Sequence, residues 1–387
     1  MITSKTHIAN NVIGYLKGNQ KEMLGLLKDM VAIESPSNNP IALNNMILFI
    51  QERLEELGFY TMHMAGVKTG GFLYARPRIR KRHSRMQLLV GHCDTVWDID
   101  TLKEIPITQK NDKLSGPGVY DMKAGITQIL CALLAIKELE LDLVVTPVIL
   151  INTDEEIGSH ESTPIIKRLS RIADRAFILE PPLGVDGKLK TARKGIGRFI
   201  ITVKGKAAHA GLDPEKGVSA IVELSHQIQQ LHAMNDFEKG ITINVGMIEG
   251  GNSPNTIAAE SKAIIDVRVY NNEDGEYITK KIHQLKPTLD DVELTIEGGI
   301  GRQPMERTPK NKQLWEKAKA TGELMDLTLE QAIAGGGSDG NTTSLYTATL
   351  DGLGTTGDGA HAKHEFIYID KLIERTALLT MLLLDDI

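Results

Sequence analysis

Three apolar segments decide the fold class: MQLLVG at 86–91, VVTPVILIN at 144–152 and RAFIL at 175–179. Each is a short apolar run of the kind typical of a buried strand. Potentially reactive side chains follow each run: His92, then Asp154 to Glu156, then Glu180. Helical patterns at 124–140 and 159–170 separate the strands, and this alternation predicts an α/β/α domain built on a mixed sheet. Ligands of such sheets bind beyond the carboxyl ends of the strands, where these polar residues fall.

A second pattern begins near Gly195. Its expected elements are a strand at 197–205, a helix at 217–234, strands at 240–250 and 260–270, a helix at 276–285 and a strand at 292–298. The order β-α-β-β-α-β is that of a ferredoxin-like α+β module. We therefore expect an inserted domain of residues 195–302, with residues 1–194 and 303–387 forming one catalytic domain around it.

The bulk composition is that of an ordinary globular protein. The chain has 387 residues, 41% of them hydrophobic and 24% charged, with a net charge of −6. The absence of a basic excess disfavours nucleic acid as a partner. Cys93 and Cys131 are too few for a disulfide framework. Since we recognise neither a signal peptide nor a membrane-spanning run, we expect a cytoplasmic location and no membrane partner.

Two motifs contain candidate metal ligands that are ambiguous when taken singly. In GHCDTVWD, the spacing of His92 and Asp94 lets a carboxylate orient a metal-bound imidazole, although an ordinary polar loop also fits. In SGPGVYDMKAG, Asp121 precedes a helix and could equally be its N-cap. Cys93, between His92 and Asp94, is more consistent with a small buried residue than with a ligand.

The acidic run in NTDEEIGS crowds like charges at the end of a buried strand, which costs free energy unless cations or protons compensate. A solvated acidic loop is the alternative, but Glu180 in ILEPP repeats the arrangement. His361 lies in a Gly-rich segment, where a surface histidine is the ordinary interpretation and His364 competes for any role. The segment GGGSDGN at 335–341 lacks the residue order of a phosphate-binding loop, so we expect a tight backbone turn there.

Taken together, these motifs supply two imidazoles and three carboxylates: His92, Asp121, Glu156, Glu180 and His361. This donor set suits zinc and is acceptable to cobalt or manganese. If Asp121 bridges two ions, each has three protein ligands and a position for a shared water, as in catalytic sites. Glu155 then remains as the general base.

Seven motifs occur in the order and at about the spacing of one family: GHCDTV, GPGVYDMKAG, DEEIGS, LEPP, GKAAHAG, GGGSDGN and GAHAKHEF. The chain resembles the dinuclear zinc peptidases and deacylases that include glutamate carboxypeptidase, aminoacylase, acetylornithine deacetylase and succinyl-diaminopimelate desuccinylase. Its pattern is most similar to that of glutamate carboxypeptidase. Tyr120 and Cys93 depart from the smaller or aliphatic residues that are commoner beside the ligands in this family.

The resemblance implies specific roles for the candidate residues. One ion would be held by His92 and Glu180 and the other by Glu156 and His361, with Asp121 bridging. The resemblance also implies that Asp94 orients His92, that Glu155 passes the proton of the water to the leaving amine, and that the peptide bond after Asp121 is cis.

The resemblance further implies that the inserted domain is a dimerisation domain and that the enzyme is a homodimer. His209 in GKAAHAG would stabilise the oxyanion in the active site of the partner subunit. Asn255, Arg268 and Arg302 resemble substrate-binding positions, although either arginine could instead form a salt bridge.

The leading hypothesis is a metallopeptidase or amidohydrolase that cleaves an amide bond beside a free carboxylate, as in a small peptide or an N-acyl amino acid. A deacetylase or desuccinylase of a biosynthetic intermediate would share every catalytic residue and differ in pocket contacts. The third hypothesis is a metal-binding homologue without turnover, which an intact Glu155 and a complete ligand set disfavour.

Overall fold

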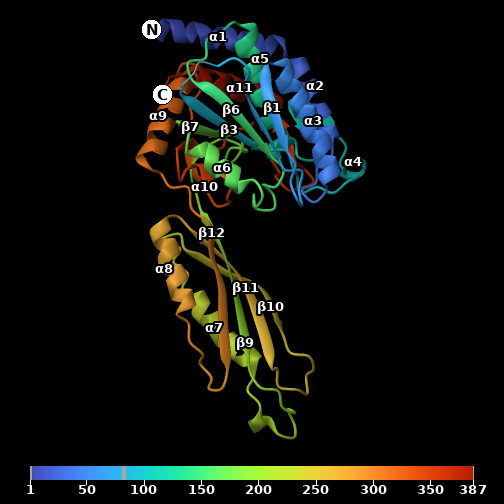
Figure 1. Cartoon of the computed structure of the whole chain (residues 1–387), viewed down its shortest axis with the longest axis vertical. Coiled ribbons are helices and arrows are strands. Elements are labelled where there is room, and N and C mark those ends of the chain that lie inside the picture. Colours follow the sequence, from blue (N-terminus) through green and yellow to red (C-terminus); the bar gives the residue numbers. More distant parts are fainter. Residues whose placement is uncertain (1, 81–83, 387) are drawn as a thin grey trace. The chain divides into compact units, whose positions relative to one another are not determined.

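The computed structural model describes residues 2–80 and 84–386, and it divides into two compact units (Figure 1). Unit 1 comprises Met1–Thr191, Arg307–Ile333 and Ser338–Ile387, and unit 2 comprises Ala192–Glu306 and Ala334–Gly337. The boundaries expected from the sequence fall within a few residues of these. The short segment Ala334–Gly337 was not expected to belong to the second unit.

Unit 1 is built on a six-stranded sheet with the order β1-β2-β6-β3-β7-β14. The strands are β1 (Phe59–Met64), β2 (Phe72–Pro77), β6 (Thr146–Asn152), β3 (Met86–His92), β7 (Arg175–Ile178) and β14 (Ala348–Leu350). The last four in the sheet order are parallel, whereas β1 and β2 form an antiparallel edge. The predicted mixed α/β sheet is therefore confirmed.

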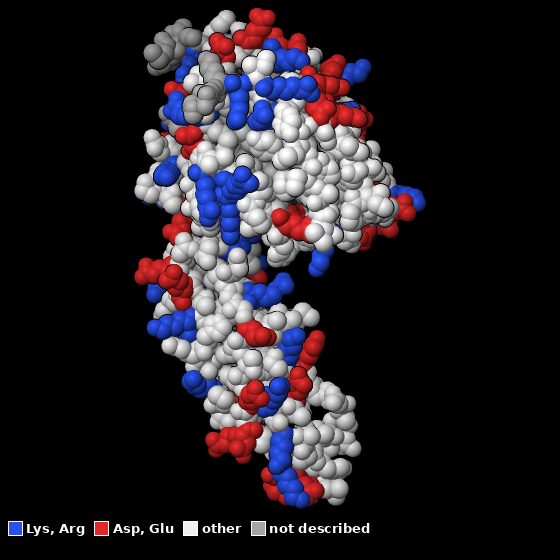
Figure 2. Space-filling model, viewed as in Figure 1, with Lys and Arg blue, Asp and Glu red and all other residues white. Residues whose placement is uncertain are grey.

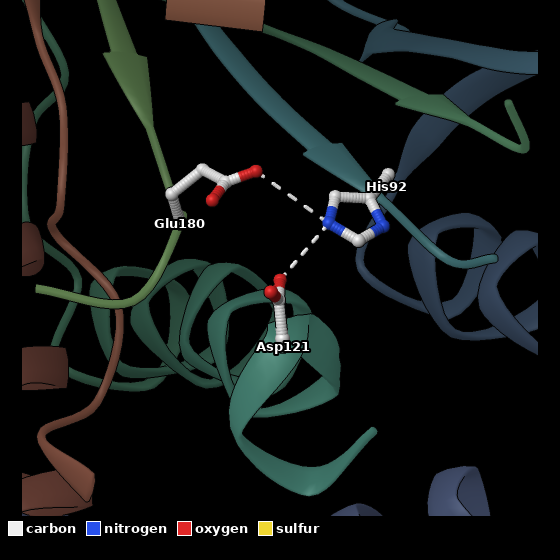
Figure 3. A group of neighbouring side chains, drawn as sticks. All are labelled: His92, Asp121 and Glu180. Carbon is white, nitrogen blue, oxygen red and sulfur yellow. Dashed lines mark hydrogen bonds and ion pairs between the residues drawn. The ribbon is translucent and has the colours of Figure 1, made fainter. Parts of the chain in front are cut away.

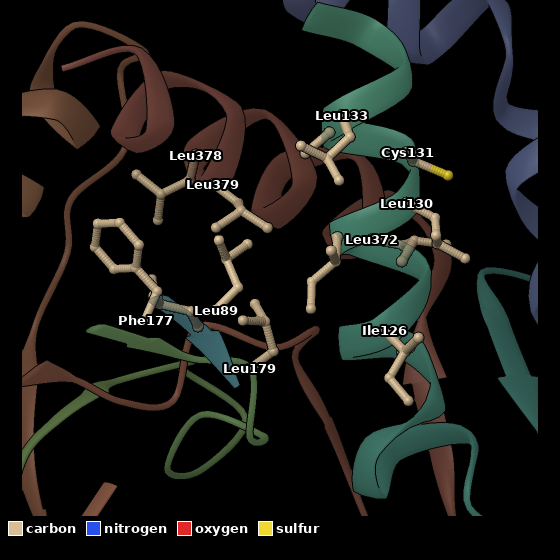
Figure 4. Packing of buried hydrophobic residues seen from close by; sticks show 14 of the residues in the cluster. Leu89, Ile126, Leu130, Cys131, Leu133, Phe177, Leu179, Leu372, Leu378 and Leu379 are labelled. Carbon is tan, nitrogen blue, oxygen red and sulfur yellow. The ribbon is translucent and has the colours of Figure 1, made fainter. Parts of the chain in front are cut away.

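Both faces of this sheet are covered because successive strand residues point to opposite sides. Leu89 of β3 packs with α5 (Ala124–Glu138) and α11 (Ile369–Leu384), and Figure 4 shows Phe177 and Leu179 in the same cluster. Leu88 belongs to a separate cluster with residues of α6 (Thr163–Ser170). This is the three-layer α/β/α arrangement that the sequence predicts.

The remaining helices of unit 1 are α1 (Ile2–Gly18), α2 (Gln20–Ala32), α3 (Pro40–Glu56), α4 (Thr101–Glu104), η1 (Val119–Lys123), α9 (Pro309–Glu323) and α10 (Asp339–Thr343). The continuous stretch Val119–Glu138 has the length and apolar composition of a candidate membrane span, although no such span was expected from the sequence. Its most apolar window is 89% buried inside unit 1, as expected of a core helix.

A small four-stranded sheet in unit 1 has the order β15-β16-β5-β4. Its members are β4 (Thr108–Lys110), β5 (Lys113–Ser115), β15 (Gly357–Asp358) and β16 (Phe366–Tyr368). Pairing of Ser115 with Phe366 brings the Gly-Pro-Gly turn beside the segment that contains His361. A further two-stranded sheet pairs β8 (Leu189–Arg193) with β13 (Gln331–Ala334).

Unit 2 has the predicted β-α-β-β-α-β order. Its elements are β9 (Gly195–Lys204), α7 (Ala220–Ala233), β10 (Thr242–Gly250), β11 (Glu260–Val269), α8 (Asn272–His283) and β12 (Glu293–Arg302), with a short turn of helix η2 (Pro214–Lys216). The sheet order is β10-β11-β9-β12 and every pair is antiparallel, which is the ferredoxin-like arrangement. On the face drawn in Figure 2, acidic and basic side chains are interspersed over both units.

Candidate metal centre

Parallel strands bring the candidate residues of unit 1 to one edge of the sheet. His92 is the last residue of β3, and Glu180 lies shortly after β7. Glu155 and Glu156 follow β6, the other neighbour of β3. Because the three strands run in the same direction, their carboxyl ends converge at the position expected for a ligand.

The inner group is the name we use for His92, Asp121 and Glu180 (Figure 3). The His92 Nε2 atom lies 3.2 Å from Asp121 Oδ1 and 3.5 Å from Glu180 Oε1. Asp121 belongs to η1, and α5 begins after Lys123 without a side-chain cap, so the N-cap alternative for Asp121 is wrong. The peptide bond between Asp121 and Met122 is cis, as the resemblance implies.

The outer group consists of Asp121, Glu156 and His361. The His361 Nε2 atom lies 3.0 Å from Glu156 Oε2 and 3.7 Å from Asp121 Oδ2. The two oxygens of Asp121 are thus directed to different histidines. A carboxylate in this position can serve both groups at once, as a bridging ligand does.

The spacing of the donor atoms fits a pair of small divalent cations. Ligands 2.0 to 2.1 Å from a tetrahedral zinc ion are separated by about 3.3 Å. The contacts of His92 and His361 with the carboxylates, from 3.0 to 3.7 Å, lie around that value. In each group the donor atoms all lie within 4.8 Å of one another. Three donors per ion leave a coordination position for water or substrate, as in catalytic sites.

The electrostatics of the metal-free centre also favour cation binding. Burial disfavours the charged imidazole of His92, but Asp121, Asp94 and Glu180 outweigh it and raise its pKa well above the ordinary value. The hydrogen bond that His361 donates to the Glu156 carboxylate raises the pKa of His361 to about 9. The carboxylates that hold a proton on each histidine would also attract a divalent cation, which binds the neutral imidazole in place of the proton.

Asp94 connects His92 to the acidic loop. The His92 Nδ1 atom hydrogen-bonds to the main-chain oxygen of Asp94 at 3.0 Å, and the Asp94 carboxylate lies farther away, at 3.4 Å. That carboxylate accepts hydrogen bonds from Ser37 Oγ and from the main-chain N–H groups of Glu155 and Glu156. Asp94 thus orients the imidazole mainly through its carbonyl, whereas the sequence favoured its carboxylate.

The other residues beside the ligands have identifiable local contacts. Asp154 accepts hydrogen bonds from the main-chain N–H groups of Glu161 and Ser162, so it shapes the acidic loop. Cys93 is fully buried, burial raises its thiol pKa, and it belongs to neither group. The Tyr120 hydroxyl donates to the carbonyl oxygen of Pro182.

Two buried carboxylates, Asp339 and Glu365, lie in motifs of the family resemblance but were not predicted from the sequence to have a role. Asp339, in GGGSDGN, accepts hydrogen bonds from Asn152 and Ser159 at the two ends of the acidic loop, both at 2.5 Å. This segment forms the cap of α10 and therefore supports the acidic loop. The second residue is Glu365, a buried carboxylate that accepts hydrogen bonds from the turn containing Asp121.

Four other candidates lie in unit 2: His209, Asn255, Arg268 and Arg302. The Nδ1 atom of His209 accepts hydrogen bonds from two main-chain N–H groups, those of Gly211 and Leu212. Arg268 Nε pairs with Asp266 at 2.7 Å, which is the salt-bridge alternative considered for this arginine. These four residues are not members of the metal-ligand groups, which belong to unit 1.

Comparisons with known proteins find similar chains. Residues 191–288 match the family model of a peptidase dimerisation domain. The chain is 30% identical to carboxypeptidase G2 of Pseudomonas sp. (strain RS-16), over 95% of this chain and 89% of that protein. It is 25% identical to acetylornithine deacetylase of Myxococcus xanthus, over 71% and 74% of the two chains.

A solved structure shows the same fold. It is a dinuclear metal-binding peptidase of the M20 family from Bacillus subtilis, with a TM-score of 0.72 and 14% identity. The match covers 95% of this chain and 98% of the bacterial one. Both units are therefore part of one known architecture.

Proposed function

Because this chain belongs to the M20 family of metallopeptidases and amidohydrolases, we propose that it cleaves an amide bond beside a free carboxylate in a small peptide or an N-acyl amino acid. The observation that carries the proposal is the placement of Asp121, whose two oxygens are shared between the inner and outer groups. Members of the family act on amide bonds. The carboxypeptidase relative, which aligns with 95% of the chain, supports the finer assignment.

We assign one cation to His92, Asp121 and Glu180, and a second to Asp121, Glu156 and His361. Zinc suits this mixture of imidazole and carboxylate donors, and cobalt or manganese would also be accepted. When bound, the cations would lower the pKa of a water to about 7 and polarise the scissile carbonyl.

Glu155 is assigned as the general base. Asp94 holds the main chain of Glu155 and Glu156 through separate carboxylate oxygens, at 3.3 and 3.2 Å, so it couples the base to a ligand. Glu155 would accept a proton from the attacking water and return it to the leaving nitrogen. The cost of losing such proton transfer is typically 10² to 10⁴-fold in rate.

Unit 2 supplies the proposed contacts with the partner subunit and with the substrate. Since His209 Nδ1 accepts hydrogen bonds from two main-chain N–H groups, the neutral form of the imidazole carries its proton on Nε2. An Nε2–H donor is what stabilisation of an oxyanion in a partner's site requires. We keep Asn255 and Arg302 as substrate contacts, and Arg268 as a weaker one because Asp266 already pairs with it. A homodimer formed through unit 2 and a cytoplasmic location complete the proposal.

The alternative activity is removal of an acetyl or succinyl group from an amino-acid intermediate. The similarity to an acetylornithine deacetylase favours it. Such an enzyme would use the same inner and outer groups, and the difference would lie in pocket contacts.

A substrate panel tests the proposal. Protein freed of metal by a chelator is reloaded with zinc, cobalt or manganese and assayed against dipeptides, N-acyl amino acids, N-acetylornithine and succinyl-diaminopimelate. We expect turnover of substrates with a carboxylate beside the amide, and an amidated substrate serves as the control. Preference for the biosynthetic intermediates would favour the alternative, and no turnover with any metal would favour a metal-binding homologue without activity.

A further inference from the structure

Glu365 is a buried carboxylate whose two oxygens are surrounded by hydrogen-bond donors. Its Oε1 atom accepts from the main-chain N–H groups of Tyr120, at 2.8 Å, and Asp121, at 3.0 Å. Its Oε2 atom accepts from Gly118 N, at 2.8 Å, and from Trp97 Nε1, at 3.0 Å. Glu365 is only 1% exposed to solvent. A buried carboxylate needs hydrogen bonds to offset its lost hydration, and four donors face this one.

The donors come from separate parts of the chain that also carry metal-ligand candidates. Gly118, Tyr120 and Asp121 belong to the turn that presents the shared carboxylate. Trp97 lies in the loop that follows β3, five residues beyond His92. Glu365 itself stands four residues after His361. One carboxylate therefore connects the segments that present a ligand of the inner group, the shared ligand and a ligand of the outer group.

The segment from His361 to Glu365 is held in a defined conformation. Ala362 N donates to Gly359 O at 2.8 Å, and Glu365 N donates to Ala362 O at 3.0 Å, so two successive turns run from Gly359 to Glu365 and His361 lies in the first of them. Gly359 has a φ of +84°, and a Cβ atom there would lie 2.9 Å from the Glu365 Cα atom. The close approach requires glycine and fixes Glu365 relative to the histidine.

We propose that Glu365 is a positioning residue that sets the separation of the two metal sites by holding Asp121 against the His361 segment. The proposal rests on the metal centre of the proposed function. It explains why a carboxylate is used: a carboxylate accepts at both oxygens, whereas an amide of the same shape presents an N–H₂ group to two of the four donors. Mutation of residues that hydrogen-bond to metal ligands or to their supporting groups typically lowers metal affinity or activity by about 10 to 100-fold.

The test is Glu365→Gln, which preserves the shape of the side chain. We expect zinc to bind about 10 to 100-fold more weakly, measured by competition with a chromophoric chelator, and kcat to fall at limiting zinc while KM changes less than about twofold. Excess zinc should restore part of kcat. Glu104→Gln is the matched control, because Glu104 contacts Lys363 in the same segment at 3.3 Å but is exposed. Its zinc affinity should equal that of the unmodified protein.

A purely structural role predicts a different result. Glu365→Gln would then lower the melting temperature of the metal-free protein while both zinc ions bind with unchanged affinity, and this result would overturn the proposal. Failure of the unmodified protein to bind two ions would instead contradict the proposed function. If Glu365→Gln does not fold, Trp97→Phe removes one donor, and we expect about threefold weaker zinc binding. Unchanged affinity in that variant would also overturn the proposal.

Discussion

The inner and outer groups share Asp121 but differ in their exposure to solvent. The His92 side chain is 2% exposed and extends from the end of a central strand. The His361 side chain is 53% exposed, and its residue lies in a loop with a φ of +61°. The inner group is thus part of the sheet framework, whereas the outer group has a ligand on a connecting segment.

This difference separates two requirements of a dinuclear centre. A buried group of carboxylates needs a cation or a proton to remain folded, because unpaired buried charge is costly. A partly exposed group costs less when empty and gives the substrate access. We therefore expect the cation of the inner group to contribute more to the free energy of unfolding than the cation of the outer group.

Loss of the shared ligand should have the largest effect, since it abolishes the distinction between the groups. In Asp121→Asn both groups lose an anionic oxygen. We expect kcat/KM to fall by about 10³-fold or more, because the charge stabilisation that metals provide is worth several kcal/mol. Metal content should fall below two ions per chain by elemental analysis. Retention of two tightly bound ions would show that Asp121 does not bridge.

Removing one histidine from each group should destabilise the metal-free protein to different extents. In His92→Ala, the carboxylates of Asp121 and Glu180 lose a buried partner, and we expect the metal-free protein to be destabilised by about 3 to 5 kcal/mol. In His361→Ala the lost contacts are partly exposed, and about 0 to 1 kcal/mol is expected. Denaturant unfolding of chelated samples measures both values. Equal destabilisation of the two variants would contradict the distinction.

The sequence predicted the strands and their polar ends because these are local signals. The apolar runs before His92 and Glu180 became parallel neighbours in the sheet, and the β-α-β-β-α-β order became a ferredoxin-like unit. The fold class and the candidate metal ligands could be predicted from such patterns.

Contacts between distant segments could not be predicted in this way. Glu365 bonds to a turn more than 240 residues earlier in the chain, and Asp339 bonds to a loop 180 residues earlier. Neither contact produces periodicity. The strands of the small sheet, only two or three residues long, carry no alternation to detect. The sequence also favoured the wrong group of Asp94. Its main-chain oxygen, and not its carboxylate, is the closer partner of His92.

The pH dependence of the metal-free protein offers a smaller test of the outer group. The pKa of His361 is raised to about 9 from an ordinary value of 6.5, first by its hydrogen bond with Glu156. Its stabilising contribution is therefore complete below about pH 6.5 and is lost as the pH rises through about 9. Thermal unfolding of chelated protein should show this loss, and His361→Ala should remove it.

Zinc binding should follow the opposite trend across the same window. Because zinc binds the neutral imidazole, the metal must displace a proton from His361 at lower pH, and affinity should rise towards pH 9. Calorimetry in buffers with different ionisation enthalpies measures the released proton. A zinc affinity that is independent of pH between 6.5 and 9 in the unmodified protein would contradict this assignment.

The smallest expected effect distinguishes His361 from His364, which the sequence left as competitors. His361 contacts Glu156 and Asp121, whereas His364 is exposed and belongs to neither metal-ligand group among the described residues. We expect His364→Ala to keep kcat/KM, zinc stoichiometry and stability within about twofold and 0.5 kcal/mol of the unmodified protein, as for surface substitutions. His361→Ala, three residues away in the same segment, should lose the outer ion. A loss of zinc in His364→Ala as large as in His361→Ala would contradict the assignment of His361 as the outer ligand.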